Sequence, residues 1–161
     1  MIRMRKKWIV FVVLLVCAVN GKSQGYKTAL GLRAGLGYGV TVKHSIKDNI
    51  AIEGIVQSRW RGANFVGLYE IYHNAFDVPH LHWYYGFGGH IGFWNNNYIH
   101  PHRTYYGNGY TVLGVDGIIA IEYNFQEVPV NISLDWKPEI NIIGYRGFWA
   151  DAGALSVRYI F

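Results

Sequence analysis

Closely spaced histidines are the first residues of this chain that suggest chemistry. His80 with His82, and His100 with His102, each stand two positions apart, and residues at that spacing share one face of a strand. Such a pair could supply two ligands to a metal ion. No cysteine and no nearby acid completes either pair, so we expect these histidines to lie in polar loops or at an interface. We expect no metal and no cofactor.

A serine activated by a histidine and an acid is a second possible chemistry. It requires the serine hydroxyl within hydrogen-bond reach of the imidazole. Residues of these types occur in segments where apolar and polar positions alternate: His90, Ser133, Ser156, Glu122 and Asp135. The sequence alone brings neither serine next to the histidine. We therefore assign no catalytic residue.

Aromatic residues gather in and beside the longest predicted loop, which covers residues 95–109. The candidates for ligand binding there are Trp94, Tyr98, Tyr105, Tyr106 and Tyr110. Aromatic rings in a polar loop suit the recognition of a glycan or a protein, because they combine apolar area with a polar edge. The alternative is that they pack on the rim of the fold.

The N-terminal residues have the order of a secretory signal. Arg3, Arg5, Lys6 and Lys7 precede an apolar run over residues 8–19, and small residues follow up to Ser23. The apolar run is shorter than the roughly 20 residues that a membrane-spanning helix needs. We predict a cleaved signal peptide over residues 1–23 and one domain over residues 24–161.

The net charge of +5 belongs to this signal segment. Five of the 15 lysines and arginines lie within residues 1–23 and no acid does, so 10 basic residues face 10 acidic ones in the remainder. A neutral domain gives no support for a nucleic-acid partner. The one cysteine, Cys17, lies in the apolar run, so we expect no disulfide in the processed protein.

Alternation with period two runs through nearly all of the predicted domain. In residues 112–125, for example, Leu113, Val115 and Ile119 alternate with Asp116 and other polar or small residues, which is the pattern of a strand. The segments with this pattern are residues 28–42, 50–60, 64–73, 82–94, 112–125, 130–142 and 155–161. Read unsplit, they give seven strands. Splitting residues 28–44 at the glycines of 35–37 gives eight, and single-chain bacterial barrels use an even number.

The two faces of these strands differ in a way that decides which side is inside. Large rings crowd the apolar face, and the interior of an eight-stranded barrel is too narrow to hold them all. The opposite face holds small residues and charges of both signs, which can pair when enclosed: Arg33, Lys43, Glu53, Arg59, Glu70, Asp116, Glu122, Asp135, Lys137, Glu139 and Arg158. We predict an all-β fold, a transmembrane antiparallel up-and-down β-barrel of eight strands with these charges inside.

The chain resembles the small outer-membrane β-barrel proteins of the OmpA/OmpX type. The resemblance rests on the predicted signal peptide, the opening strand over residues 31–36 and the terminal strand over residues 155–161. It implies a location in the outer membrane of a Gram-negative type of cell, contact with outer-membrane lipid, and recognition of the C-terminal strand, which ends at Phe161, by the barrel-assembly machinery. Three expected outer loops, around residues 35–37, 61–64 and 144–148, are short for that family.

The expected function is therefore non-enzymatic. We expect an outer-membrane protein with a lumen filled by side chains and a structural or interaction role at the cell surface, with a glycan or a protein as a possible partner. Some eight-stranded outer-membrane barrels modify lipid A with a histidine, a serine and an acid near the rim, so lipid A acyl transfer or deacylation is the alternative. A narrow channel is the third candidate.

Overall fold

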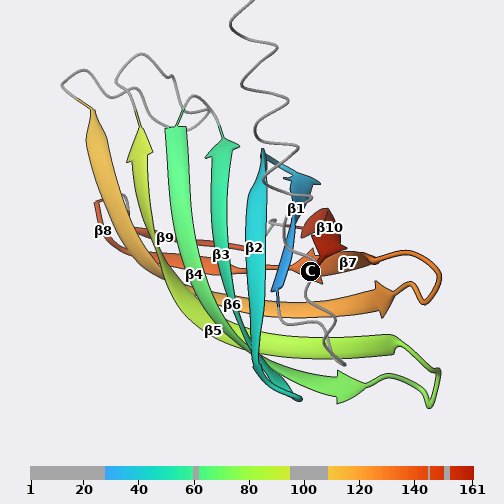
Figure 1. Ribbon diagram of the computed structural model, residues 1–161. Coiled ribbons are helices and arrows are strands. Elements are labelled where there is room, and N and C mark those ends of the chain that lie inside the picture. The colour runs from blue at the N-terminus through green and yellow to red at the C-terminus, as the bar shows by residue number, and fades with distance from the viewer. Residues whose placement is uncertain (1–27, 60–61, 95–108, 145, 151–152) are drawn as a thin grey trace, which may run out of the picture.

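The computed structural model describes residues 28–59, 62–94, 109–144, 146–150 and 153–161 (Figure 1). The predicted signal peptide lies outside these residues. The described residues form ten strands and no helix. Accordingly, no described helix is long and apolar enough to cross a membrane. The strands are β1 (Thr28–Gly35), β2 (Tyr38–Lys47), β3 (Ile50–Arg59), β4 (Gly62–Asn74), β5 (Leu81–Trp94), β6 (Tyr110–Asn124), β7 (Val130–Trp136), β8 (Glu139–Ile143), β9 (Gly147–Trp149) and β10 (Gly153–Ile160).

The sheet closes on itself into an antiparallel barrel. Each strand from β1 to β7 pairs with the next, and β10 pairs with both β7 and β1. The strand β8 continues the course of β7 along β6, and β9 pairs with β8 as β10 pairs with β7. The ten segments therefore make eight barrel strands, two of them interrupted. The predicted all-β, eight-stranded antiparallel barrel is confirmed.

The first hairpin confirms the split at the glycines. The strand β1 ends at Gly35 and β2 begins at Tyr38, and the Gly35 N–H donates to the Gly37 carbonyl at 2.8 Å. A two-residue connection of this kind joins adjacent antiparallel strands. Without it the barrel would have an odd number of strands.

Two local features differ from the sequence prediction. The strand expected over residues 130–142 is broken at Lys137 and Pro138, because proline has no N–H to donate to the ladder. The Pro138 carbonyl still accepts from the Gly117 N–H at 2.9 Å, so pairing resumes at once in β8. The short loop expected around residues 144–148 was placed wrongly in part, since residues 147–149 form β9.

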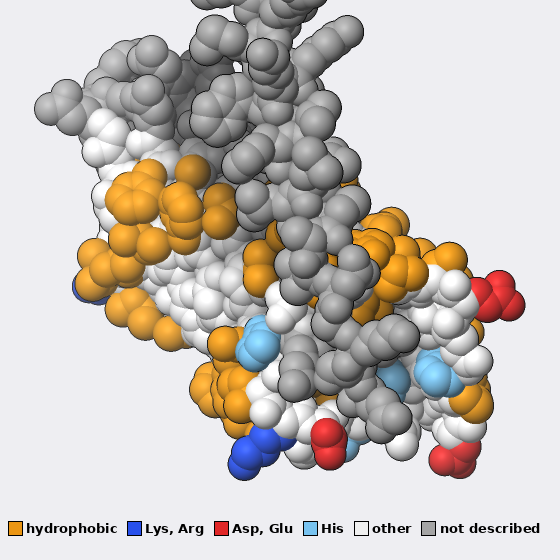
Figure 2. Space-filling model, in the orientation of Figure 1, with side chains coloured by type: hydrophobic (Ala, Val, Ile, Leu, Met, Phe, Trp, Pro, Cys, Tyr) orange, Lys and Arg blue, Asp and Glu red, His pale blue; other side chains and the backbone are white. Residues whose placement is uncertain are grey.

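The alternation of side chains places small and charged residues inside and large apolar residues outside. In β4, Val66 and Leu68 break the alternation in sequence, yet they are 5% and 4% exposed and lie on the inner face. On the outer face Leu32 is 70% exposed and Phe87 is 64% exposed. Figure 2 shows apolar side chains grouped over the outer surface of the barrel. The barrel is therefore apolar outside and charged inside.

Glycines allow the strands to curve tightly. A methyl group on Gly88, on the inner side of β5, would lie 1.8 Å from the Gly67 carbonyl oxygen of β4. A methyl group on the neighbouring Gly67 would point outward and meet nothing within 4 Å. The inner position is thus closed to any larger residue, and the outer one is open.

This contrast generates a test of the barrel geometry. Gly88→Ala is expected to lower the free energy of unfolding by about 1–3 kcal/mol, because the backbone must shift to admit the methyl group. Gly67→Ala is the matched control and should leave it unchanged or raise it by about 0.4–1 kcal/mol, because alanine restricts the unfolded chain. Urea unfolding of the purified barrel measures both, and equal losses for the two variants would contradict the inward placement of Gly88.

Candidate functional site

All eleven charged residues expected on the inner face are buried, and none is more than 8% exposed. Ten of them come from eight of the strands, Lys137 lies between β7 and β8, and together they form three groups. We name them the Lys43 cluster (Lys43, Glu53, Glu70, Glu122 and Arg158), the Asp116 cluster (Arg59, Asp116, Lys137 and Glu139 with His90) and the Arg33–Asp135 pair.

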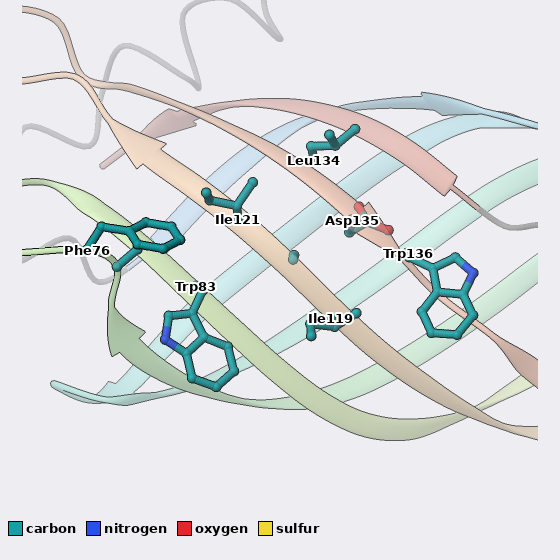
Figure 3. A pocket seen from close by; sticks show the side chains of 9 residues that line it. Phe76, Trp83, Ile119, Ile121, Leu134, Asp135 and Trp136 are labelled. Atoms are coloured by element: carbon teal, nitrogen blue, oxygen red, sulfur yellow. The ribbon is translucent and has the colours of Figure 1, made fainter. Parts of the chain in front are cut away.

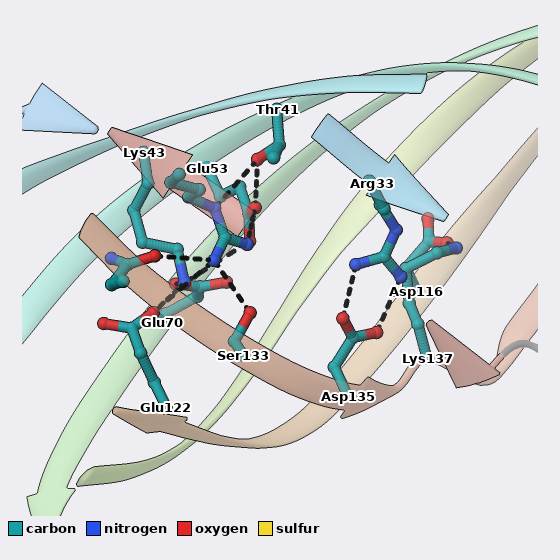
Figure 4. Close-up of polar contacts among 12 residues, drawn as sticks. Arg33, Thr41, Lys43, Glu53, Glu70, Asp116, Glu122, Ser133, Asp135 and Lys137 are labelled. Carbon is teal, nitrogen blue, oxygen red and sulfur yellow. Dashed lines mark hydrogen bonds and ion pairs between the residues drawn. The ribbon is translucent and has the colours of Figure 1, made fainter. Parts of the chain in front are cut away.

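The ammonium of Lys43 joins carboxylates from three other strands (Figure 4). Its Nζ lies 2.9 Å from Glu70 Oε2, 3.3 Å from Glu122 Oε2 and 3.5 Å from Glu53 Oε2. An ammonium has only three N–H donors, so its contact with Glu53 Oε2, which accepts no hydrogen bond, is electrostatic. One side chain of β2 thereby ties together β3, β4 and β6.

Arg158 completes the Lys43 cluster from β10. Its Nη2 lies 2.6 Å from Glu53 Oε1, and its Nη1 donates to Ser133 Oγ at 2.7 Å and lies 3.6 Å from Glu122 Oε2. Thr41 also donates to Glu53. The planar guanidinium presents several N–H donors at fixed angles, so it bridges the two carboxylates that also contact Lys43.

Two tyrosines pack against the ammonium of Lys43. The ammonium lies 3.9 Å from the ring centroid of Tyr84 and 5.3 Å from that of Tyr72, and it donates to the Tyr72 hydroxyl at 2.7 Å. The two rings stack with centroids 4.7 Å apart. Ring faces attract a cation that has lost its hydration. The tyrosines therefore help to offset the cost of burying the ammonium.

The Asp116 cluster is built around Lys137. Its Nζ lies 2.5 Å from Asp116 Oδ1 and 3.0 Å from Glu139 Oε2, and Arg59 Nη1 lies 3.8 Å from Glu139 Oε1. His90 Nδ1 lies 2.8 Å from Asp116 Oδ2, and its Nε2 lies 2.9 Å from Asn141 Oδ1. Separately, Arg33 makes a two-pronged contact with Asp135 at 2.5 and 2.6 Å.

The charges balance if His90 is included. Both of its ring nitrogens face oxygen atoms, and only a protonated imidazole donates from both nitrogens. Counted with that proton, six cationic side chains of the described interior face six carboxylates. If every carboxyl group is counted as ionised, the Lys43 cluster has one formal negative charge in excess and the Asp116 cluster one positive charge. Near-balance of this kind is what a low-dielectric interior requires.

The structure brings together a set of possible metal ligands that differs from the histidine pairs suggested by the sequence. The ligand atoms of His90, Asp116 and Glu139 lie within 4.8 Å of one another. Lys137 contacts both of the carboxylates, so a tethered cation already occupies the place where a metal would bind them. The pair His100 and His102 lies outside the described residues. Reasoning from sequence missed this trio because it depends on the register of β6 against β8.

The structure does not assemble the serine, histidine and acid of the catalytic alternative. The partners of His90 are Asp116 and Asn141, whereas Ser133 accepts from Arg158. The Ser156 hydroxyl is buried without a hydrogen bond. Glu122 contacts Lys43 and Asp135 contacts Arg33. Among the described residues, no serine is hydrogen-bonded to a histidine.

Two of the five aromatic candidates meet at the end of the barrel where β5 ends and β6 begins. Trp94 and Tyr110 pair across these strands, and their ring centroids lie 5.7 Å apart with an angle of 11° between the planes. A pocket of about 620 Å³ lies beside them, and its lining residues are Ser58, Gly62, Ala63, Phe93, Trp94, Gly109, Tyr110 and Thr111. Tyr98, Tyr105 and Tyr106 lie outside the described residues.

A second hollow lies on the outer face of β5, β6 and β7 (Figure 3). It has a volume of about 650 Å³, and Trp83, Trp136 and Phe76 stand around a floor of Ile119, Ile121 and Leu134. The indole N–H of Trp136 donates to the Ala150 carbonyl. The hollow is therefore apolar, and the polar edge of this tryptophan is already satisfied by the protein.

The comparisons with known proteins give no family for the chain. No protein-family model matches it, and no curated protein matches it. Its function must therefore be argued from the arrangement described above.

The ion pairs of the interior can be tested at Arg158. Arg158→Met is expected to lower the free energy of unfolding by about 3–5 kcal/mol, because Glu53 is left buried without its guanidinium. The double variant Glu53→Gln with Arg158→Met should recover part of the loss, since it removes the stranded charge. Arg146→Met, at an exposed arginine, is the control. Urea unfolding of the purified barrel measures all three, and a loss at Arg158 no larger than at Arg146 would argue against the network.

Proposed function

We propose that this protein is an integral outer-membrane β-barrel with a closed lumen and a structural or interaction role at the cell surface. Residues 1–23 serve as its export signal, and outer-membrane lipid surrounds it. The observation that carries the proposal is the inverted distribution of side chains, with eleven charges buried and large apolar residues exposed. We assign it to the OmpA/OmpX type on architecture.

The exposed apolar surface is expensive in water and favourable in lipid. It runs around the barrel from Leu32 on β1 through Phe87 on β5 to Leu134 on β7 and Val157 on β10. Soluble proteins rarely expose a continuous apolar patch above a few hundred Å². In hydrocarbon every backbone group needs an internal partner, which the closed pairing of β1 with β10 and β5 with β6 supplies.

Aromatic residues at the end of the barrel that carries the C-terminus support the same placement. Tyr123 and Phe125 contact edge to face with centroids 5.1 Å or less apart, as do Tyr159 and Phe161. Near the start of β5, Trp83 stacks on His73 with ring centroids 4.8 Å apart. Membrane barrels carry such aromatic girdles at the interface with water. The Phe161 N–H donates to the Thr28 carbonyl at 2.8 Å, so the terminal residue is joined to β1.

The filled interior argues for a closed lumen. A group of apolar side chains, Ile55, Val66, Leu68, Tyr84, Ile118 and Ala120, packs together on the inner face of β3 to β6. The Lys43 and Asp116 clusters fill further interior space, and each holds ion pairs between its own members. The interior of an eight-stranded barrel is just wide enough to be filled by side chains. A structural or recognition role therefore suits this barrel better than transport.

The location of the outer face in lipid can be tested with one charge. Leu134→Arg is expected to lower the free energy of unfolding from vesicles by about 2–4 kcal/mol, the cost of arginine near the middle of a bilayer. Val128→Arg, in the turn between β6 and β7, is the control and should have little effect. In a water-soluble barrel an exposed leucine can become arginine with a change within about 0.5 kcal/mol. Equal, small effects at both positions would contradict the proposal.

The closed lumen predicts almost no ion conductance. The purified barrel, inserted into planar bilayers, should give no sustained open steps, because ion-paired side chains occupy the interior. Insertion is checked independently by the heat-dependent mobility of the same sample on gels. Stable conductance steps from an inserted barrel would contradict the closed lumen and favour the narrow channel as the function.

A further inference from the structure

The pocket beside Trp94 straddles the ends of four neighbouring strands. Two consecutive rows of paired residues line it. The first row runs from Ser58 through Ala63 and Phe93 to Thr111, and the second contains Gly62, Trp94 and Tyr110. Its volume of about 620 Å³ lies within the ~300–1,000 Å³ typical of sites for small ligands.

Two glycines make room for the indole of Trp94. A methyl group on Gly92 would lie 2.0 and 2.2 Å from Cζ3 and Cη2 of the indole, and one on Gly62 would lie 2.4 and 2.5 Å from Cδ1 and Nε1. The six-membered ring therefore lies over Gly92 and the five-membered ring over Gly62. The indole occupies the space of two side chains and is held across β4 and β5. Any residue larger than glycine at either position must displace it.

Tyr110 extends the aromatic surface onto β6. Its ring plane makes an angle of only 11° with the plane of Trp94. Hydroxyl groups belong to the neighbouring row of the lining, whose side chains alternate with these rings: Ser58 donates to the Gly62 carbonyl at 3.1 Å, and Thr111 is exposed. Among the described residues that line it, none has a charged side chain. The pocket thus combines an aromatic surface, neutral hydrogen-bonding groups and the open backbone of Gly109.

We propose that this pocket binds a neutral saccharide. A sugar ring presents C–H groups from one face, which pack on an aromatic ring, and hydroxyls from its edge, which need neutral donors and acceptors. An acidic glycan or a phosphate would find no cation among the described lining residues, and a purely apolar ligand would cover the exposed Thr111 hydroxyl without pairing it. The proposal rests on the proposed function for one point, that this end of the barrel faces outward from the cell.

The experiment uses the full barrel in a detergent without a sugar headgroup. A glycan array with neutral and acidic mono- to tetrasaccharides is the first probe, and tryptophan fluorescence titration with the best-bound neutral disaccharide is the second. Trp94→Leu and Gly92→Ala should each weaken binding by about tenfold or more, the loss expected when an aromatic anchor of a site is removed or displaced. Trp136→Leu and Gly54→Ala are matched controls on the outer face, and both should leave the affinity unchanged.

The outcomes separate this site from the proposed function. Binding of neutral glycans that is lost in the two pocket variants and kept in the two controls supports the site. No binding to any neutral glycan, binding to acidic glycans or peptides alone, or full affinity in Trp94→Leu overturns it. Heat-dependent mobility and recovery in the outer-membrane fraction report insertion for every variant. If the barrel inserts and binds no glycan, only the proposed site is contradicted. If it binds a neutral glycan and fails to insert, only the proposed membrane role is contradicted.

Discussion

The ammonium of Lys43 is the interaction on which most of the interior depends. It contacts Glu53, Glu70 and Glu122, and Arg158 bridges two of these carboxylates from the far side of the sheet closure. A group of this kind is costly to enclose and stable only when every partner is present. It also opposes any slip of the strands, because a shift by one residue would turn each of these charges toward the outer surface. Closure and register are therefore coupled through one cluster.

Much of the fold could be predicted because a strand has a period of two. Alternation was enough to separate the faces, but the pattern alone allowed seven or eight strands, and the split at residues 35–37 was preferred because single-chain bacterial barrels have an even number. The break at Pro138 could have been suspected from proline alone, yet the recovery of pairing in β8 depends on the Gly117 N–H, which lies on another strand. The segment β9 has only three residues, too few for alternation to be visible.

The partners within the interior could not be predicted for a physical reason. Arg33 and Asp135 are 102 positions apart and come together only because the barrel closes. The contact of His90 with Asp116 requires the register of β5 on β6, and that of Asp116 with Lys137 requires the interruption before β8. The position of the Trp94 indole likewise depends on another strand, because it requires the absence of a side chain at Gly62 of β4. The period of the sequence determines the face of the sheet on which a side chain lies, whereas the register between strands determines which side chains it contacts.

The same division of residues that stabilises the barrel also limits where it can recognise anything. Bulky apolar side chains cover the outside. Inside, the charged residues of each cluster are ion-paired with other members of the same cluster. Neither surface offers polar groups to a ligand in solution. At the strand ends this changes, because Ser58 and Thr111 stand beside Trp94 and Tyr110 where the sheet stops. A filled barrel with an apolar exterior can therefore be specific only at its ends, and of the two pockets described here only the one at the rim combines rings with hydroxyls.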